Sequence, residues 1–347
     1  MSEFVKRLLA WYRCNGRQLP WRGHPDPYAI WVSEIMLQQT RVNAVVPYFE
    51  RWMSHFPTIN DLAAASEQDV LNIWEGLGYY SRSRNMQRAA KLVISEYGGE
   101  LPRDIKMLTD LPGIGRSTAG AIASMAFGMN EPILDGNVRR VLARLFNYDK
   151  PVDTPIGRRY LWDIQKNNLP EGRAGDYNQA IMDLGAMVCM SRDPDCGYCP
   201  INDLCQANAL GVQKERPLLK RKPGVPYYIQ SSAIIRQAEQ VLLAHRPSKG
   251  LLGGMWEFPN GRINGNPKAD FDSTLEAAYG LRIRVDEPFG MIKHAYTHFR
   301  VTVHIYCCEL VQSYKNGALR WVNIQDLDDY PMGKIDRWIA QKLTNNI

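Results

Sequence analysis

The chain has 347 residues, 45% of them hydrophobic, which is more than one hydrophobic core usually supports, so the sequence predicts two domains. A formal charge of +6 suits a nucleic-acid partner without requiring one. Charged residues interrupt the apolar start of the chain, and no stretch reaches about 18 uncharged apolar residues, which excludes a signal peptide and a membrane-spanning helix. We therefore expect a cytoplasmic protein that does not enter a membrane.

The apolar pattern changes character along the chain. Apolar residues recur at helical spacing up to about residue 209, whereas β-rich runs separated by Gly, Asn and Pro begin at Ser231. We expect an all-helical domain over residues 1–212 and a smaller α+β domain over 227–347. Between them, residues 213–226 are basic and contain three prolines, which is typical of a linker. This linker is either a solvated tether or a segment that contacts phosphates.

Four of the seven cysteines stand close together, with no histidine among them. The odd total and the clustering favour metal binding over a secreted disulfide framework. Four thiolates suit either zinc or an iron–sulfur cluster, and spacing alone does not decide between them. The cluster consists of Cys189, Cys196, Cys199 and Cys205. This arrangement after a helical domain resembles the 4Fe-4S loop of the endonuclease III superfamily of DNA glycosylases, which implies a 4Fe-4S cofactor with a structural role.

A glycine-rich turn at Leu111, Gly113 and Gly115 lies between two predicted helices. Such a turn can expose amide groups beside a helix N-terminus and so hold a DNA phosphate, although a plain helix connector is the simpler alternative. Further along the chain stands Asp135. The glycine-rich turn followed by Asp135 resembles the helix-hairpin-helix, Gly/Pro, Asp signature of the same superfamily, which implies that Asp135 is its essential carboxylate. Asp135 can also cap the helix that begins near Asn137.

One position near the hairpin separates two reaction types. In the bifunctional members of the superfamily, which form a Schiff base and nick the strand, the residue two after the second hairpin glycine is lysine. Here that residue is Ser117, among the residues expected to contact substrate, and a hydroxyl cannot form an imine. We expect base removal with little or no lyase activity.

Residues 31–40 form an apolar predicted helix with one carboxylate, Glu34. An isolated glutamate usually belongs to a solvated helix face. Burial among these neighbours would instead raise its pKa, so that the carboxyl stays protonated and acts as an acid near neutral pH.

Four segments, at 19–22, 31–40, 76–82 and 178–185, closely resemble the MutY family of adenine glycosylases. The resemblance implies that Glu34 is the general acid, Asp135 its partner carboxylate and Asn137 a polar support. It also implies that Gln38 and Tyr79 fill the gap left by the flipped base or wedge beside its partner, and that Arg17, Trp21 and Gln179 line the adenine pocket. Trp21 and Tyr79 could equally be core aromatics, although the glycines around Tyr79 favour exposure.

The C-terminal domain resembles the Nudix-like domain of that family at residues 253–259 and 294–299. A Nudix hydrolase needs clustered glutamates for magnesium, and this chain offers only Asp272 and Glu276 there, so we expect no pyrophosphatase activity. The family reads 8-oxoguanine with a Phe-Ser-His loop, and here Thr297 and His298 occupy the corresponding positions. Polar residues on the solvent face of a β-hairpin are the alternative interpretation.

Together these features predict an all-helical glycosylase domain followed by a Nudix-like α+β domain. The expected activity is hydrolysis of adenine mispaired with 8-oxoguanine or guanine in double-stranded DNA, by a monomer associated with a nucleoid of bacterial type. Two alternatives are a thymine or oxidised-pyrimidine glycosylase of the same superfamily and a non-catalytic, metal-braced DNA-binding protein.

Overall fold

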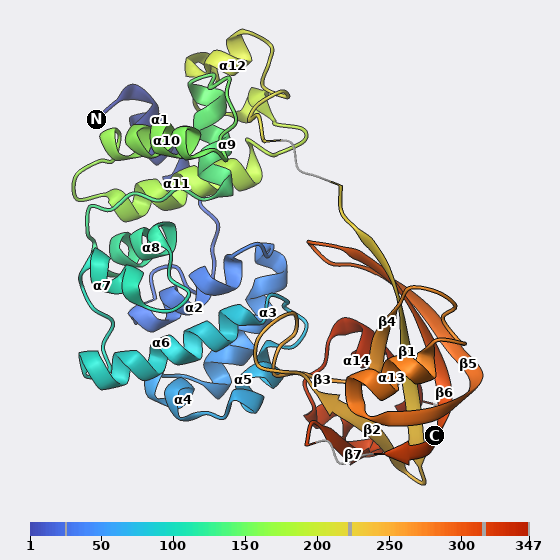
Figure 1. Cartoon of the computed structure of the whole chain (residues 1–347). Coiled ribbons are helices and arrows are strands. Elements are labelled where there is room, and N and C mark those ends of the chain that lie inside the picture. Colours follow the sequence, from blue (N-terminus) through green and yellow to red (C-terminus); the bar gives the residue numbers. More distant parts are fainter. Residues whose placement is uncertain (25, 221–223, 314–316, 346–347) are drawn as a thin grey trace. The chain divides into compact units, whose positions relative to one another are not determined.

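The computed structural model describes residues 1–24, 26–220, 224–313 and 317–345. These residues form two compact units (Figure 1). The first unit comprises Met1–Ala64 and Asn85–Lys222, and the second comprises Ala65–Arg84 and Pro223–Ile347. Part of the predicted linker, residues 221–223, lies outside the described residues. Within the described ranges, no helix is both long enough and apolar enough to cross a lipid bilayer.

The described residues of the first unit are helical and contain no strand. Its elements are α1 (Glu3–Asn15), α2 (Pro27–Leu37), α3 (Val42–His55), α4 (Ile59–Ala64), α6 (Ser81–Tyr97), α7 (Ile105–Asp110), α8 (Arg116–Phe127), α9 (Gly136–Leu145), α10 (Pro155–Asn167), α11 (Ala174–Met187), the 3-10 turns η1 (Cys196–Tyr198) and η2 (Asn202–Leu204), and α12 (Gln206–Ala209).

One hydrophobic core joins five of these helices. Leu8 of α1, Ala121 of α8, Val141 of α9, Leu161 of α10 and Ile181 of α11 are all buried in it. Helix α2 differs, because apolar residues are buried all around it instead of along one stripe. Such a pattern is typical of an interior helix, and α2 packs against α3 and α8.

The second unit is built around a seven-stranded sheet with the order β3-β2-β1-β6-β5, in which β4 also pairs with β1 and β7 with β2. The pairing of β1 with β6 is parallel, and the other strand pairs are antiparallel. The elements are α5 (Glu67–Trp74), β1 (Tyr227–Gln237), β2 (Gln240–His245), β3 (Trp256–Glu257), β4 (Asn260–Ile263), α13 (Phe271–Tyr279), β5 (Leu281–Ala295), β6 (Arg300–Ser313), β7 (Leu319–Asn323), the 3-10 segment η3 (Ile324–Asp329) and α14 (Lys334–Thr344).

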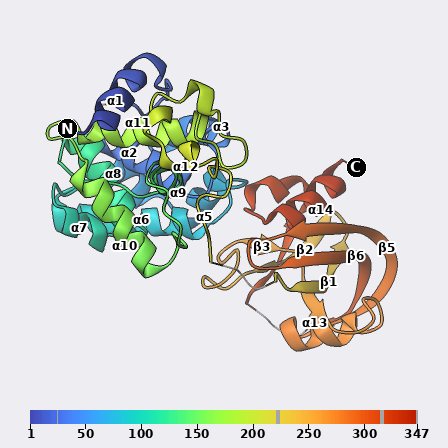
Figure 2. The ribbon, with the colours of Figure 1, turned by 90° about the horizontal axis from the view of Figure 1, so that it is seen from above.

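The two faces of the sheet carry separate cores because successive side chains of a strand point to opposite faces. Ile234 of β1 packs with Ile339 of α14, whereas its neighbour Ile235 packs with Phe271 of α13. Figure 2 shows α13 and α14 on opposite sides of the sheet. The unit is therefore an α/β/α sandwich.

Residues 65–84 belong to the second unit through specific contacts with its C-terminal part. The carboxylate of Glu75 accepts hydrogen bonds from the backbone N–H of Met332 at 3.0 Å and from Nη2 of Arg337 at 2.9 Å. Asn72 donates to the backbone carbonyl of Asp329 at 3.1 Å. These bonds attach α5 and the turn after it to η3 and α14.

Candidate active site

Helix α2 carries Glu34 into a mostly apolar environment. Asp26 caps the helix by accepting the N–H of Tyr28 at 2.8 Å, and Pro27 occupies the first helical position, where a missing N–H is harmless. The residues beside the glutamate, Ile35 among them, are buried. The sequence therefore places one carboxyl on a helix that otherwise belongs to the core.

The side chain of Glu34 is an acid poised near neutral pH. Its pKa is raised from the ordinary 4.5 to about 7, by burial first and then by the negative charge of Asp135, while the positive charge of Arg22 lowers it. The prediction that its apolar neighbours raise the pKa of this carboxyl is therefore confirmed. At pH 7 roughly half of the molecules hold Glu34 protonated and able to donate.

Asp135 lies beside Glu34 and is held in place as the N-cap of α9. Its Oδ1 accepts the N–H of Val138 at 2.7 Å, and its Oδ2 accepts Nδ2 of Asn137 at 3.2 Å. Burial raises the pKa of Asp135, while these hydrogen bonds and the charge of Arg140 lower it. The net shift of the Asp135 pKa is upward, and the hydrogen bonds, which favour the charged form of the carboxyl, limit that shift.

Asn137 is fixed from its other side by Arg140. Its Oδ1 accepts Nη2 of Arg140 at 2.8 Å, and the same nitrogen donates to the carbonyl of Gly185 on α11 at 2.6 Å. A Cβ atom at Gly185 would lie 2.7 Å from the Cβ of Asn137, so only glycine lets α11 approach α9 this closely. The structure thus brings Glu34, Asp135 and Asn137 together.

A buried aspartate with two arginines adjoins this group, and our sequence reasoning assigned it no role. Asp183 is fully buried and accepts two hydrogen bonds of 2.7 Å from the guanidinium of Arg22. Arg17 donates to the same carboxylate through its backbone N–H at 2.9 Å and its Nε at 2.8 Å. Burial alone would raise the pKa of Asp183, but the arginines outweigh it and hold the pKa below its ordinary value.

The residues expected to line the adenine pocket lie in different settings. Arg17 is engaged with Asp183, as described. Trp21 is only 5% exposed and packs edge-on against Phe49, with ring centroids 5.2 Å apart, in agreement with the core alternative. Gln179 is half-buried on α11, and its Nε2 lies 3.4 Å from the carbonyl of Gly175. Their contacts with a base stay a prediction.

The predicted hairpin lies between α7 and α8. Gly113 has a φ of +84°, and a Cβ there would lie 2.9 Å from that of Asn85, so both conformation and space require glycine. Leu111 is buried and anchors the turn, whereas Gly115 is exposed as the N-cap of α8. An exposed glycine at a helix N-terminus leaves backbone N–H groups open to an anion such as a phosphate.

The first turn of α8 connects the hairpin to the two carboxylates. Oγ of Ser117 accepts the backbone N–H of Leu134 at 3.0 Å, directly before Asp135. Nε2 of Gln38, the residue that ends α2, donates to Oγ1 of Thr118 at 3.2 Å. The hairpin helix therefore contacts both the loop that carries Asp135 and the helix that carries Glu34.

The four clustered cysteines follow α11 and surround η1 and η2. Each of Cys196, Cys199 and Cys205 has its pKa raised by burial first and then by neighbouring cysteines of the group, which places the four thiols close together. Within the described part of the chain, no group of three or more His, Cys, Asp or Glu side chains is arranged to hold a metal ion.

Arg144 connects the cysteines to the core. It is 1% exposed, and its Nη1 donates to Sγ of Cys189 at 3.2 Å and to the carbonyl of Met190 at 2.6 Å. The charge of Arg144 lowers the pKa of Cys196, although burial makes the net shift of that pKa upward. Four sulfur donors gathered beside a buried cation fit a cofactor that binds thiolates.

Three predicted substrate residues belong to the second unit. Tyr79 is 40% exposed, as the surrounding glycines predict, and its backbone is left-handed with a φ of +50°. Its hydroxyl lies 2.8 Å from Oγ1 of Thr297, and both Thr297 and His298 are exposed in the turn between β5 and β6. The guanidinium of Arg82 lies 5.4 Å from the centre of the Tyr79 ring. This unit thus presents an aromatic ring and a hydroxyl side by side.

Residues 32–163 match the family described as HhH-GPD superfamily base excision DNA repair protein, and residues 232–342 match the NUDIX domain. The chain is 34% identical to the adenine DNA glycosylase of Rattus norvegicus, over 89% of this chain and 71% of that protein. It is 37% identical to the adenine DNA glycosylase of Buchnera aphidicola, over 85% of this chain and 83% of that protein. The structure of a thermostable thymine-DNA glycosylase covers 60% of this chain and 95% of its own, with 29% identity and a TM-score of 0.55.

A buried pair of carboxyls with raised pKa values beside a helical hairpin suits a DNA N-glycosylase of base-excision repair, and the family match agrees with this class. The similarity over most of both chains is more specific. The chain belongs to the adenine DNA glycosylase family. The predicted combination of a helical glycosylase fold with a Nudix-like α+β fold is confirmed.

Proposed function

We propose that this N-glycosylase hydrolyses the bond between adenine and deoxyribose where adenine is mispaired with 8-oxoguanine or guanine in double-stranded DNA. The observation that carries the proposal is the carboxyl pair, in which Glu34 has a pKa of about 7 beside Asp135. The names of the relatives support adenine as the base.

In the first step Glu34 donates a proton to the base. Adenine must leave the base stack to be reached, at a cost of a few kcal/mol that contacts in the enzyme offset. Its N7 is a hydrogen-bond acceptor, so the protonated carboxyl of Glu34 transfers its proton there. The electron pair of the N-glycosidic bond then moves onto the base, and adenine departs as a neutral molecule.

In the second step Asp135 stabilises the sugar. The sugar develops positive charge as the bond breaks, and an ionised carboxylate stabilises that charge or adds to the sugar briefly. The hydrogen bonds from Val138 and Asn137 hold the carboxylate in one orientation for this role. Water then adds to the sugar, and its proton passes to a carboxylate of the pair. In this proposal Glu34 acts as the acid and Asp135 as the electrostatic partner, the division of roles that paired carboxyls with different pKa values allow.

The product of the proposed reaction is an intact DNA strand that lacks one base. Ser117 has no amine to form an imine with the sugar, and its oxygen already accepts the N–H of Leu134. Treatment with borohydride, which reduces imines to stable amines, should therefore trap no complex between protein and DNA. A trapped complex at the level of a bifunctional glycosylase would contradict this part of the proposal.

Recognition of the opposing base is assigned to Tyr79, Thr297 and His298. The 2.8 Å contact between the hydroxyls of Tyr79 and Thr297 supports a shared role, because it orients an aromatic ring for stacking and leaves a polar group beside it. Thr297→Ala should reduce the preference for adenine opposite 8-oxoguanine over adenine opposite guanine. The rate with guanine as the partner is the internal control, and an unchanged ratio would contradict the assignment.

Cys189, Cys196, Cys199 and Cys205 are proposed to hold a 4Fe-4S cluster, which when bound would brace this loop and not take part in acid–base chemistry. Their proximity and the guanidinium of Arg144 support it. Purified protein should contain four iron and four sulfide per chain, within error. One zinc per chain without sulfide would support the structural-zinc alternative instead.

A panel of duplexes tests the function as a whole. Adenine opposite 8-oxoguanine or guanine should be released in single turnovers, whereas thymine opposite guanine should remain, which separates adenine removal from the thymine alternative. The same protein should elute as a monomer. DNA as substrate supports a location at the nucleoid, which imaging of the tagged protein would test.

A further inference from the structure

Helix α5 and its C-cap carry a row of polar side chains that the proposed function does not use. Gln68, Asn72 and Glu75 are spaced three or four residues apart, so they lie on one face of the helix. Oε1 of Gln68 accepts Nε1 of Trp256 at 3.3 Å, and Asn72 donates to the carbonyl of Asp329. This face of α5 is therefore bonded to the C-terminal part of the second unit.

The last side chain of the row forms a bidentate ion pair. Nε and Nη2 of Arg337 donate to Oε1 and Oε2 of Glu75 at 2.5 and 2.9 Å. The two side chains are 16% and 18% exposed, so salt and water screen the pair only weakly. Two parallel bonds from a guanidinium to a carboxylate fix their relative orientation as well as their distance. Glu75 is thus held in one position against α14.

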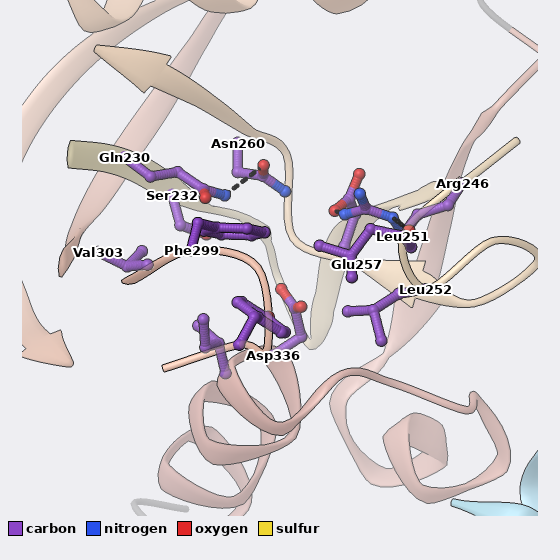
Figure 3. Close-up of a pocket in the computed structure, with 12 residues that line it drawn as sticks. Gln230, Ser232, Arg246, Leu251, Leu252, Glu257, Asn260, Phe299, Val303 and Asp336 are labelled. Carbon is purple, nitrogen blue, oxygen red and sulfur yellow. Dashed lines mark hydrogen bonds and ion pairs between the residues drawn. The ribbon is translucent and has the colours of Figure 1, made fainter. Parts of the chain in front are cut away.

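The start of α14, which carries Arg337, is itself attached to the sheet. Oδ1 of Asp336, the residue before Arg337, accepts the backbone N–H of Phe258 at 3.1 Å. Figure 3 shows this carboxyl directed from α14 into the space between Phe299 and Glu257. Two successive residues of the helix therefore bond to different parts of the unit, one to the loop after β3 and the other to the end of α5.

A short, internally bonded turn leads from Glu75 to Tyr79. Three residues separate the two, and the carbonyl of Gly78 accepts Nε1 of Trp74 at 3.0 Å and Nη2 of Arg82 at 3.0 Å. Tyr79 has a left-handed backbone, a conformation that a residue with a side chain keeps only where its surroundings determine it. A displacement of Glu75 would therefore move Tyr79 as well.

The far end of this turn is attached to the same body as its start. The hydroxyl of Tyr79 lies 2.8 Å from Oγ1 of Thr297, in the turn between β5 and β6. Phe299, which follows that turn, packs in the same hydrophobic core as Ile339 of α14. The ion pair of Glu75 and the hydroxyl contact of Tyr79 thus hold the turn at two points of one core.

We propose that Glu75 and Arg337 are positioning residues for recognition of the base opposite adenine. Their ion pair fixes the turn that presents Tyr79, so that its ring and the hydroxyl of Thr297 meet 8-oxoguanine in one geometry. The inference rests on the proposed function, because it takes Tyr79 and Thr297 as the contacts to the opposing base. Release of adenine itself should persist without the ion pair, because the two catalytic carboxyls lie in the first unit.

Loss of the ion pair should affect 8-oxoguanine more than guanine. Stacking on an aromatic ring accepts any base, since every base has a π-face. A hydrogen bond to the lesion depends on where the hydroxyl lies, because such bonds weaken steeply with distance and angle. A loosened turn therefore keeps much of the stacking and loses the contact that distinguishes the two bases.

Single-turnover release of adenine by the full-length protein, from duplexes with 8-oxoguanine or guanine opposite adenine, tests the proposal. Glu75→Gln keeps the shape of the side chain and removes its charge. The ratio of the two rates should fall about fivefold or more, a usual scale for coupling between sites, with the rate opposite guanine nearly unchanged. Arg337→Lys keeps the charge but cannot form two parallel bonds, so it should lower the ratio as well.

Asp328→Asn is the matched control. Asp328 pairs with Nη1 of the same guanidinium at 2.8 Å, but it is 90% exposed. A surface pair of this kind contributes little, so the variant should keep the wild-type ratio of rates.

Two further measurements show whether Glu75 acts through Tyr79. In a Tyr79→Ala background, Glu75→Gln should not lower the ratio further, because residues that act through one another are not additive. Amide hydrogen exchange of residues 76–82, which needs no DNA, should be faster in Glu75→Gln than in wild type.

An unchanged ratio in folded Glu75→Gln and Arg337→Lys proteins would overturn the proposal. Equal losses of rate opposite both bases would do so too, because they indicate a structural role alone. An undiminished effect of Glu75→Gln in the Tyr79→Ala background, or unchanged amide exchange, would also overturn it. A wild-type protein without a preference for 8-oxoguanine would contradict the proposed function and this inference with it, so the wild type alone distinguishes the two failures.

Discussion

The side-chain oxygen of Ser117 accepts a hydrogen bond of 3.0 Å from the backbone N–H of Leu134, the residue directly before Asp135. This bond ties the first turn of α8 to the loop that presents the proposed electrostatic carboxylate. The position that distinguishes hydrolysis from strand nicking in the sequence therefore also has a structural role.

Ser117→Ala should loosen this loop. Loss of the hydrogen bond leaves a backbone N–H without its partner, which should lower the free energy of unfolding by about 1–3 kcal/mol and reduce the single-turnover rate several-fold. Urea denaturation and quenched-flow assays measure the two effects. Ser117→Thr keeps the hydroxyl and should remain near wild type; equal losses in both variants would show that the hydrogen bond is not the cause.

The single-turnover rate should depend on pH through both carboxyls. Glu34 must be protonated to act, and its pKa is about 7, so the rate should fall up to tenfold per pH unit above that value. Asp135 must be ionised, and because its pKa is raised above 3.8 the rate should also fall on the acidic side. A rate constant that stays level from pH 6 to pH 9 would contradict the role of Glu34.

The raised pKa of Glu34 should also be detectable in the pH dependence of protein stability, without any substrate. A group whose pKa is raised on folding favours the folded state only at low pH, and that contribution is lost as pH rises from about 4.5 to about 7. Glu34→Gln removes the buried charge and should be more stable than wild type at pH 8 by about 1–3 kcal/mol, with a much smaller difference at pH 5. Thermal unfolding at the two pH values gives the comparison, and a pH-independent difference would argue against a raised pKa.

Asp183 should act as a positioning residue for Arg22, whose charge lowers the pKa of Glu34. Asp183→Asn breaks a buried ion pair and should cost about 3–5 kcal/mol of stability. In the protein that remains folded, the alkaline limb of the pH profile should shift upward. Asp176→Asn is the matched control on α11, because Asp176 is exposed and forms a surface ion pair with Arg173. An unshifted pH profile in a folded Asp183→Asn protein would show that the position of Arg22 does not influence the pKa of Glu34.

The sequence predicted the parts of the site that local chemistry determines. An apolar helix around Glu34 predicted a carboxyl with a raised pKa, and its pKa is raised to about 7. Asp135 before a predicted helix suggested an N-cap, and the bond to Val138 is of that kind. Gly113 was expected in a special turn, and its φ of +84° agrees. Each of these follows from residues a few positions apart.

Long-range partners could not be predicted. Arg22 and Asp183 both stand in recognisable segments, but no periodicity relates residues so distant in sequence, and the pairing emerges only when α11 packs against α1. The attachment of Glu75 to Arg337 has the same origin. The domain limits proposed at 212 and 227 stay predictions.

The most direct measurement is the single-turnover release of adenine by Glu34→Gln from a duplex with adenine opposite 8-oxoguanine, beside a binding titration of the same duplex. Glu50→Gln in α3, an exposed glutamate, is the matched control. We predict that Glu34→Gln binds the duplex within about threefold of wild type but loses a factor of at least about 10² in rate, the scale of general acid catalysis. A Glu34→Gln protein that releases adenine at the wild-type rate would contradict it.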